Sequence, residues 1–208
     1  MQRFVATVGA LMALVHFGHA AAAAQEATPA AGDPPPLPGQ IAEATREFRS
    51  SGARADGASA FRFSVGQFVD ATSAEAAVPA VVERIVTQTT MTARESANVP
   101  GFGDETLVFG GPIASGAATL ETVVVLVRDG HYLHVWLGAG LAADPLPDLV
   151  AVGERVFARP APVDVTPATG DVVAQWMLVL VQGLNDLPPG FVMSKEATEV
   201  EEVATPAA

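Results

Sequence analysis

The stretch TLETVVVLVRDGHYLHVWLG, residues 119–138, decides the fold that the sequence predicts. Two runs rich in β-branched and aromatic residues flank the dipeptide Asp129-Gly130, and such runs favour β-strands. Asp-Gly tolerates the positive φ angles that a type I′ two-residue turn requires. We therefore expect a β-hairpin with strands over 119–128 and 131–138.

The register of this hairpin fixes which side chains share a face. With Asp129-Gly130 as the turn, Arg128 pairs with His131 and the other pairs follow in order. One face then carries Val124, Leu126, Leu133, Val135 and Leu137. The other face carries Val123, Val125, Val127, Tyr132, His134 and Trp136. Because both faces are apolar, we expect the hairpin to lie centrally in a sheet or to be covered on each side.

The segments around the hairpin predict the remaining elements of an α+β domain. Strands are expected over 61–69, over 106–109 (ended by Gly110-Gly111-Pro112), within 87–99 and over 191–193. Helices are expected over 41–50, after the capping-box spacing of Thr72–Glu75, after Asp144-Pro145 and over 172–184. The fold class is therefore an antiparallel sheet of about four to five strands, with helices packed mainly on one face.

The first 24 residues have the pattern of a cleavable signal peptide. Arg3 supplies a positive charge, residues 4–18 are apolar, and small residues continue to Ala24. We expect cleavage between Ala24 and Gln25. A retained N-terminal anchor is the alternative, because the alanines extend the apolar run toward the roughly 20 residues of a spanning helix. No cysteine is present to carry a lipid.

The rest of the chain divides by composition into four parts. The expected parts are a Pro/Ala-rich linker over 25–39, an α+β domain over 40–163, a C-terminal helix and turn docked on it over 164–193, and an acidic disordered tail over 194–208. After cleavage we expect no insertion into a membrane, and a location in the periplasm or the medium.

Charge and cysteine content exclude several classes of function. The net charge at pH 7 is −12, and removal of residues 1–24, which contain Arg3 and no acidic residue, makes it −13. An acidic chain repels phosphate backbones and anionic lipid headgroups, so we expect no nucleic-acid partner. The absence of cysteine excludes a thiolate zinc site and a cysteine nucleophile. It also means that packing alone must stabilise the domain in an oxidising compartment.

Candidate catalytic and metal-binding groups are few. His131 and His134 are the only histidines after the signal peptide, and residues three apart on a strand point to opposite faces. Asp104-Glu105 lacks the alternating acids of a calcium loop, so we favour capping or solvation of a turn. Gly101-x-Gly103 lacks the third glycine of a dinucleotide loop. We therefore expect no cofactor, no metal and no recognisable catalytic residue.

Tyr132, His134 and Trp136 form the one candidate patch for a ligand or partner. If helices cover only the opposite face of the sheet, these three side chains lie on an open surface. The alternative is that the helix expected over 172–184 lies across them.

Two motifs carry a resemblance to known proteins. The run Val-Pro-Gly-Phe-Gly-Asp-Glu over 99–105 precedes the hairpin Arg128-Asp129-Gly130. This order, over roughly residues 60–160, resembles a module of exported bacterial proteins of unknown function. More loosely, it is similar to extracytoplasmic sensor-type domains of bacterial lipoproteins and receptor kinases. Residues 185–191 resemble the opening of such a module, as in a truncated second copy. The resemblance implies no known reaction.

Together these features predict a secreted or periplasmic non-enzymatic binding or interaction module. Its partner is an unknown small ligand or protein, and its oligomeric state is open. The alternative is an extracytoplasmic hydrolase whose catalytic residues are scattered in the sequence. Whether polar side chains converge in a concave pocket separates the possibilities.

Overall fold

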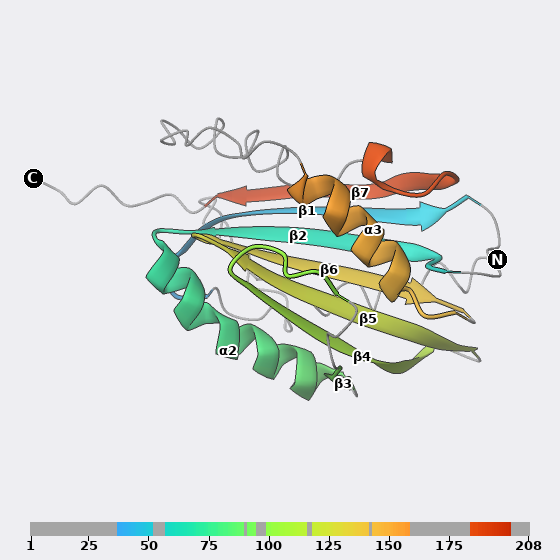
Figure 1. Ribbon diagram of the computed structural model, residues 1–208, viewed down its shortest axis with the longest axis horizontal. Coiled ribbons are helices and arrows are strands. Elements are labelled where there is room, and N and C mark those ends of the chain that lie inside the picture. Colours follow the sequence, from blue (N-terminus) through green and yellow to red (C-terminus); the bar gives the residue numbers. More distant parts are fainter. Residues whose placement is uncertain are drawn as a thin grey trace, which may run out of the picture.

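The structure, a computed structural model, describes residues 37–51, 57–89, 91–94, 99–115, 118–141, 143–158 and 184–200. Within these ranges the chain forms one antiparallel sheet of seven strands, in the order β3-β4-β5-β6-β2-β1-β7 (Figure 1). The strands are β1 (Gln40–Ser50), β2 (Ala60–Phe68), β3 (Thr92–Ala93), β4 (Glu105–Ser115), β5 (Ala118–Asp129), β6 (Tyr132–Gly140) and β7 (Phe191–Val200). The helices are α2 (Ala71–Gln88), α3 (Leu146–Phe157) and the 3₁₀ turn η2 (Leu184–Asp186). The expected class, α+β with an antiparallel sheet, is confirmed, whereas the expected four to five strands are too few.

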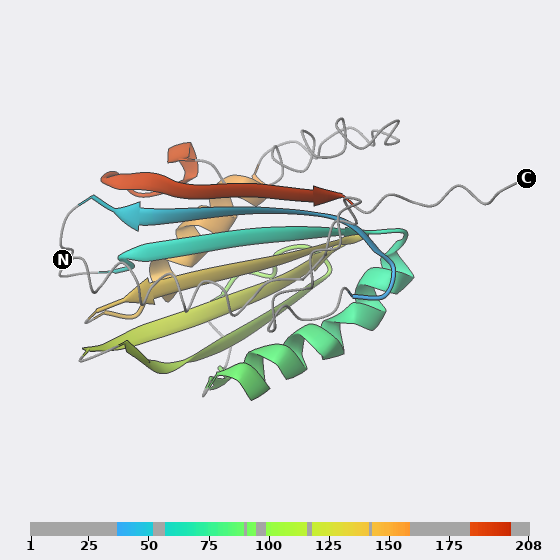
Figure 2. The same cartoon turned by 180° about the vertical axis from the view of Figure 1, so that it is seen from behind.

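The two described α-helices lie on opposite faces of the sheet. Val81 and Ile85 of α2 pack with Leu133 and the other residues of one hairpin face. Leu149 of α3 belongs to a second core cluster, on the face that carries Trp136. Figure 1 shows α3 in front of the sheet, and Figure 2 shows α2 in front when the molecule is seen from behind. The expectation that helices pack mainly on one face is therefore wrong, because each apolar face of the central hairpin has its own cover.

The hairpin has the predicted faces but a different register. Asp129 pairs with Tyr132, so Gly130-His131 forms the two-residue loop. Gly130 has a φ of 56°, and no non-glycine residue of the described ranges has a positive φ. This arrangement fits a type II′ turn, which needs a positive φ only at its first central residue. The register differs from the predicted one by two residues, and an even shift leaves every side chain on its predicted face.

The first described strand was misassigned from the sequence, and the last was predicted over 191–193 but is longer. Residues 41–50 form β1 rather than a helix, because β1 pairs with β2 on one side and with β7 on the other. Residues 194–200, expected to begin a disordered tail, belong to β7. Arg46 of β1 forms an ion pair with Glu196 of β7 at 2.6 Å between Nε and Oε2, which offsets part of the negative charge that suggested disorder.

Strand β4 continues through Gly110-Gly111-Pro112, where the sequence suggested its end. It pairs with β5 along its whole length, and Pro112 lies opposite Glu121. On its other side β4 pairs with β3 only at Phe109 and Gly110. Proline is tolerated in a strand at such an edge position.

Helix α2 begins at Ala71, with Asp70 as its N-cap rather than the predicted Thr72–Glu75 box. The Asp70 carboxylate accepts a hydrogen bond from the backbone N–H of Ser73 at 2.7 Å. Ala74 and Ala77 of α2 are buried against the sheet, whereas Val86 is largely exposed.

Several predicted segments lie outside the described residues. They are the signal peptide with its cleavage site at Ala24 and Gln25, most of the proline-rich linker, and the helix expected over 172–184 up to residue 183. Among the helices that are described, none is long and apolar enough to cross a membrane.

Candidate functional site

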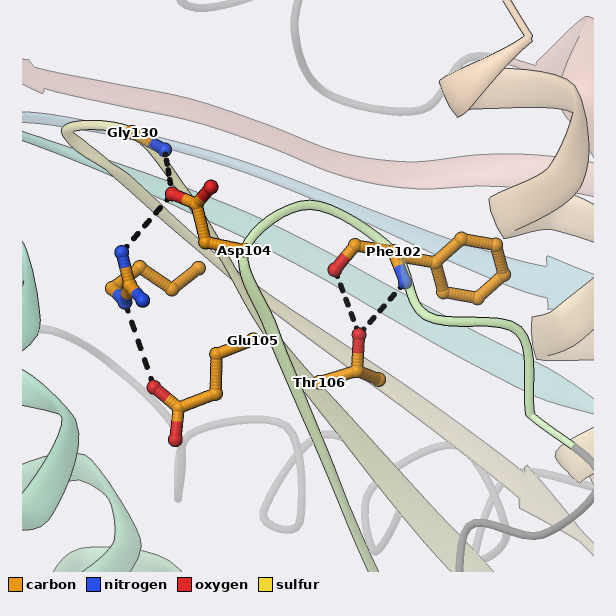
Figure 3. A network of polar contacts seen from close by, with 6 residues as sticks. Phe102, Asp104, Glu105, Thr106 and Gly130 are labelled. Carbon is orange, nitrogen blue, oxygen red and sulfur yellow. Dashed lines mark hydrogen bonds and ion pairs between the residues drawn. The ribbon is translucent and has the colours of Figure 1, made fainter.

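The two sequence motifs at 99–105 and 128–130 meet in space (Figure 3). The Asp104 Oδ2 atom accepts hydrogen bonds from the backbone N–H of Gly130 at 2.9 Å and from Arg128 Nη1 at 3.0 Å. The backbone N–H of Asp104 donates in turn to the Arg128 carbonyl at 2.8 Å. Gly103 is required here, since its φ is +57° and an added Cβ atom would lie 2.4 Å from the Arg128 carbonyl oxygen. The motif therefore holds the loop before β4 against the hairpin turn.

Glu105 and Thr106 complete this network (Figure 3). The Arg128 Nε atom lies 3.5 Å from Glu105 Oε2, so one guanidinium engages both carboxylates. The Thr106 hydroxyl accepts from the Phe102 N–H at 2.9 Å and donates to the Phe102 carbonyl at 2.8 Å. The described residues contain no group of three or more His, Cys, Asp or Glu side chains that could hold a metal ion.

Phe102 carries the loop into an aromatic cluster beneath α3. We define the aromatic cluster as Phe102, Tyr132, His134, Trp136 and Phe157. The Phe102 ring lies 5.5 Å from Trp136 and 5.4 Å from Phe157, between ring centroids. The His134 ring lies 6.2 Å from Trp136 and 6.0 Å from Phe157. These separations are those of packed aromatic pairs in protein cores.

The three residues of the predicted ligand patch are all in this cluster, but they do not form an open surface. Trp136 is fully buried and His134 is 5% exposed, whereas Tyr132 is partly exposed. Phe102 and Phe157 contact the rings of Trp136 and His134. The cover that the structure shows thus comes from α3 and the Phe102 loop.

His134 is held neutral by its surroundings. Burial in the aromatic cluster lowers the pKa of its imidazole from 6.5 to about 4. Its Nδ1 atom and the Trp136 Nε1 atom have no hydrogen-bond partner among the described residues. His131 lies in the two-residue loop before β6. His134 therefore serves packing rather than proton transfer near neutral pH.

A polar chain of buried side chains runs along β1 and β2 on the face that α2 occupies. Its members are Gln40, Glu43, Thr45, Glu47, Arg62 and Ser64. The Thr45 and Ser64 hydroxyls are 2.8 Å apart, and Thr45 donates to Glu43 Oε1 at 3.2 Å. Burial lowers the pKa of Arg62, while Glu43 and Glu47 act in the opposite direction.

This polar chain places a hydroxyl beside a carboxylate, but solvent and substrate cannot reach the hydroxyl. A hydroxyl beside a carboxylate is one way to build a nucleophile. Thr45 is 3% exposed and Ser64 is 2% exposed, so neither hydroxyl is open to a substrate. These hydrogen bonds pair the buried Thr45 hydroxyl with Ser64 and Glu43 inside the sheet.

An open pocket lies on the α3 face, beside the start of α3. It has a volume of about 500 Å³ and is lined by Arg94, Gly110, Gly111, Glu121 and Asp144. Arg94 follows β3, and its side chain lies flat over Gly110, where an added Cβ atom would be 2.4 Å from Arg94 Cδ. A glycine in β4 is therefore what lets Arg94 reach the loop before α3.

The Arg94 side chain is clamped by Asp144. Arg94 Nη1 donates to Asp144 Oδ1 at 3.1 Å, and Nη2 donates to Oδ2 at 2.7 Å. The Asp144 Oδ1 atom also accepts from the backbone N–H of Leu146 at 3.1 Å. These contacts, the Arg94 hydrogen bonds first, lower the pKa of Asp144. The pKa of Arg94 is raised by the same hydrogen bonds, and the negative charges of Asp144 and Glu121 also contribute.

Sequence reasoning missed this pocket. It interpreted Asp144 only as a helix cap and Gly110-Gly111 only as the end of a strand, and it did not single out Arg94 or Glu121. Arg94 and Asp144 are 50 positions apart in the sequence, so only the pairing of strands in the sheet brings them together. The one local signal of the pocket in the sequence was the pair Gly110-Gly111 inside a run with β-propensity. Glycines within a strand indicate that another group approaches the backbone closely.

Comparison with known proteins gives no match, so any functional proposal must rest on the fold and the pocket. No protein-family model matches the chain. No curated protein and no solved structure shows significant similarity to it.

Proposed function

We propose that this protein is an exported, non-enzymatic binding module whose ligand site is the pocket at Arg94, Glu121 and Asp144. The observation that carries the proposal is the convergence of three charged side chains on one concave site. The volume of the pocket, about 500 Å³, lies in the range typical of ligand clefts.

The electrostatics of the pocket favour binding over catalysis. Asp144 has a lowered pKa and is held ionised by Arg94, so it has no proton to donate near neutral pH. The described side chains that line the pocket are one guanidinium and two carboxylates, and the Asp144 carboxylate is already engaged by Arg94 through two hydrogen bonds. The pocket thus offers fixed charges and hydrogen bonds rather than a proton-transfer pair.

Rigid support of the pocket also fits a binding role. Both carboxylate oxygens of Asp144 accept hydrogen bonds from Arg94, and Asp144 is tied to the start of α3 through the Leu146 N–H. The pocket floor is a paired strand, because Gly110 and Gly111 of β4 lie opposite Val123 and Thr122 of β5. Preorganised groups lose little entropy when a ligand binds.

Export rests on the pattern of residues 1–24, a positive start, an apolar run and an Ala-x-Ala end. The resemblance of the 99–105 and 128–130 motifs to exported bacterial proteins supports the same location. We infer release into the periplasm or the medium, with Gln25 as the N-terminal residue of the mature chain. N-terminal sequencing of the exported protein checks this directly, and an N-terminus at Met1 would show a retained anchor instead.

The binding role is tested by a screen of chemically diverse small molecules against the exported chain. The readout is the pair of backbone amide signals of Gly110 and Gly111 in a ¹H–¹⁵N spectrum, because these residues line the pocket. We expect at least one compound class to shift both signals in the wild type and in Arg49→Gln, but not in Arg94→Gln. Arg49→Gln is the control, because it removes the same positive charge from β1, away from the pocket.

Two results would overturn this proposal. In one, no compound shifts the Gly110 and Gly111 signals. In the other, mass spectrometry shows that a bound compound is converted to product by the wild type and not by Arg94→Gln, which would make the pocket an active site.

A further inference from the structure

We propose that Gln67 and the aromatic cluster form a second, enclosed binding site, which takes a small neutral molecule with a hydroxyl group on an aromatic ring. The inference is independent of the pocket at Arg94. It rests on three neighbouring side chains, Gln67, His134 and Trp136, each of which has a buried polar atom with no hydrogen-bond partner in the described part of the chain.

Strand pairing places these three side chains beside one another on the α3 face of the sheet. Gln67 of β2 lies opposite Tyr132 of β6, and His134 and Trp136 follow on the same face at alternate positions of β6. The His134 ring lies 6.5 Å from Tyr132 and 6.2 Å from Trp136, between ring centroids. Gln67 is the diagonal neighbour of His134, within reach of a long side chain across the strand pair.

All three side chains are shielded from water. The exposed fraction is 5% for Gln67, 5% for His134 and 0% for Trp136. A buried polar atom without a partner has lost its hydrogen bonds to water and gained none in return, which costs stability. Such atoms are rare in native proteins. Three of them on adjacent side chains therefore point to a hydrogen-bonding molecule that the native protein holds at this place.

The three atoms define the hydrogen-bonding groups of that molecule. The Trp136 Nε1–H only donates, the Gln67 Oε1 atom only accepts, and the His134 Nδ1 atom does either according to its tautomer. A hydroxyl group both accepts and donates. One hydroxyl can thus accept from Trp136 and donate to Gln67 or His134.

The surroundings favour a neutral molecule with an aromatic body. Gln67 and the aromatic cluster contain no group that is charged near neutral pH, because burial lowers the pKa of His134 to about 4. A charged ligand group would therefore be buried without a counter-charge. The rings of Phe102, Tyr132 and Phe157 offer offset and edge contacts to another aromatic ring. Mostly aromatic walls with a few polar groups are typical of small-molecule sites.

The structure also indicates the side from which such a molecule enters. There is no space directly beneath α3, since a Cβ atom added at Gly153 would lie 2.6 Å from Phe102 and 2.7 Å from Trp136. Tyr132 and Phe157 both contact His134, and both are only partly buried. Phe157 is the last residue of α3. Rotation of these two rings opens a path to Gln67 and His134 without displacement of the helix.

The test compares phenol with toluene, which has the same shape but a methyl group in place of the hydroxyl. The readout is the indole N–H signal of Trp136 in a ¹H–¹⁵N spectrum of the exported chain. The chain has two tryptophans, and the variant Trp176→Phe identifies the Trp136 signal as the one that remains. We expect phenol to shift this signal saturably and to bind at least about tenfold more tightly than toluene, a difference of about 1.4 kcal/mol.

Two variants check that Gln67 provides this preference. Gln67→Leu keeps the size of the side chain and removes the acceptor, so the preference for phenol over toluene should fall to within about twofold. Ser64→Ala removes a buried polar group of the same strand on the opposite face and should keep the preference of the wild type. A ratio of two affinities in one variant is insensitive to a moderate loss of stability.

Three results would overturn the inference. Equal affinity for phenol and toluene would show that the hydroxyl is not recognised. An unchanged preference in Gln67→Leu would show that Gln67 is not part of the site. If neither probe shifts the Trp136 signal, water or packing alone accommodates the three polar atoms. Each of these results leaves the proposed role of the Arg94 pocket untouched, because that role is followed by the Gly110 and Gly111 signals.

Discussion

Acidification should destabilise this protein through His134, a buried imidazole whose pKa is lowered to about 4 by desolvation. In the unfolded chain the same group has a pKa of about 6.5. Below pH 6.5 the unfolded state therefore binds a proton that the folded state excludes, and the free energy of unfolding falls as the pH falls. The contribution of His134 is fully present above pH 6.5 and is lost as the pH falls from 6.5 to about 4.

The magnitude follows from the two pKa values. At pH 5 the linkage relation gives a loss of about 2 kcal/mol, and below pH 4 the loss approaches about 3 kcal/mol. That is a large share of the roughly 5–15 kcal/mol by which a typical domain is stable. Carboxylates also titrate in this range, so the effect of His134 has to be isolated with variants.

The assay is urea denaturation at pH 7.5 and pH 5 for the wild type, His134→Leu and His131→Gln. His134→Leu keeps an apolar side chain of similar size and removes the titrating group. We expect the loss of stability between the two pH values to be about 2 kcal/mol smaller in His134→Leu than in the wild type. His131→Gln should behave as the wild type. Equal losses in all three proteins, or a His134 pKa above 6 by NMR titration, would refute the reasoning.

Two further predictions concern packing and the hairpin turn. Gly153→Ala should lower the free energy of unfolding by about 1–2 kcal/mol, because an added Cβ atom would lie 2.6 Å from the Phe102 ring and overpacking outweighs the gain in helix propensity. Urea denaturation measures it, and Gly101→Ala, where an added Cβ meets no atom within 4 Å, should change little; equal losses would contradict the packing argument. Asp104→Ala should cost about 1 kcal/mol, because the Gly130 N–H loses its acceptor. Asp104→Asn keeps an acceptor oxygen and should cost less than half as much in the same assay, and equal losses for the two variants would show that this hydrogen bond is not the cause.

The central hairpin shows what local sequence determines. Alternation of apolar residues placed Tyr132, His134 and Trp136 on the face of Val123, Val125 and Val127, and the observed register keeps them there. The predicted register differs from the observed one by two residues, because the sequence allows two turns. Asp129-Gly130 suits a type I′ turn, and Gly130-His131 suits a type II′ turn. Local sequence constrains the period and therefore the faces, whereas the turn conformation decides the pairing.

β1 and β7 show what local sequence does not determine. Ile41, Ala44 and Phe48 have helical spacing, yet β1 is a strand because its neighbours β2 and β7 complete its hydrogen bonds. The acidic composition of 194–200 suggested disorder, and the ion pair that helps to hold it, Arg46 with Glu196, joins residues 150 positions apart. Tertiary pairing overrides weak local preference in both segments.

The same limit applies to the candidate site. The predicted patch was correctly assigned to one sheet face, but α3 on that face buries His134 and Trp136. The pocket depends on Arg94 after β3, Glu121 on β5 and Asp144 before α3, and no spacing in the chain relates them. Residues that serve a site built by several elements carry no periodic signal, and only the assembled sheet reveals them.

The pairing of β1 with β7 has a mechanical consequence. Ala42 is the register partner of Val200, so the chain enters and leaves the sheet at the same end of one antiparallel pair (Figure 1). A force that pulls residues 37 and 200 apart would load the hydrogen bonds of this pair one after another, as in a zipper, rather than all at once in shear. β7 would therefore peel away at low force while the β2–β6–β5–β4 part of the sheet, with its two helices, still bears no load.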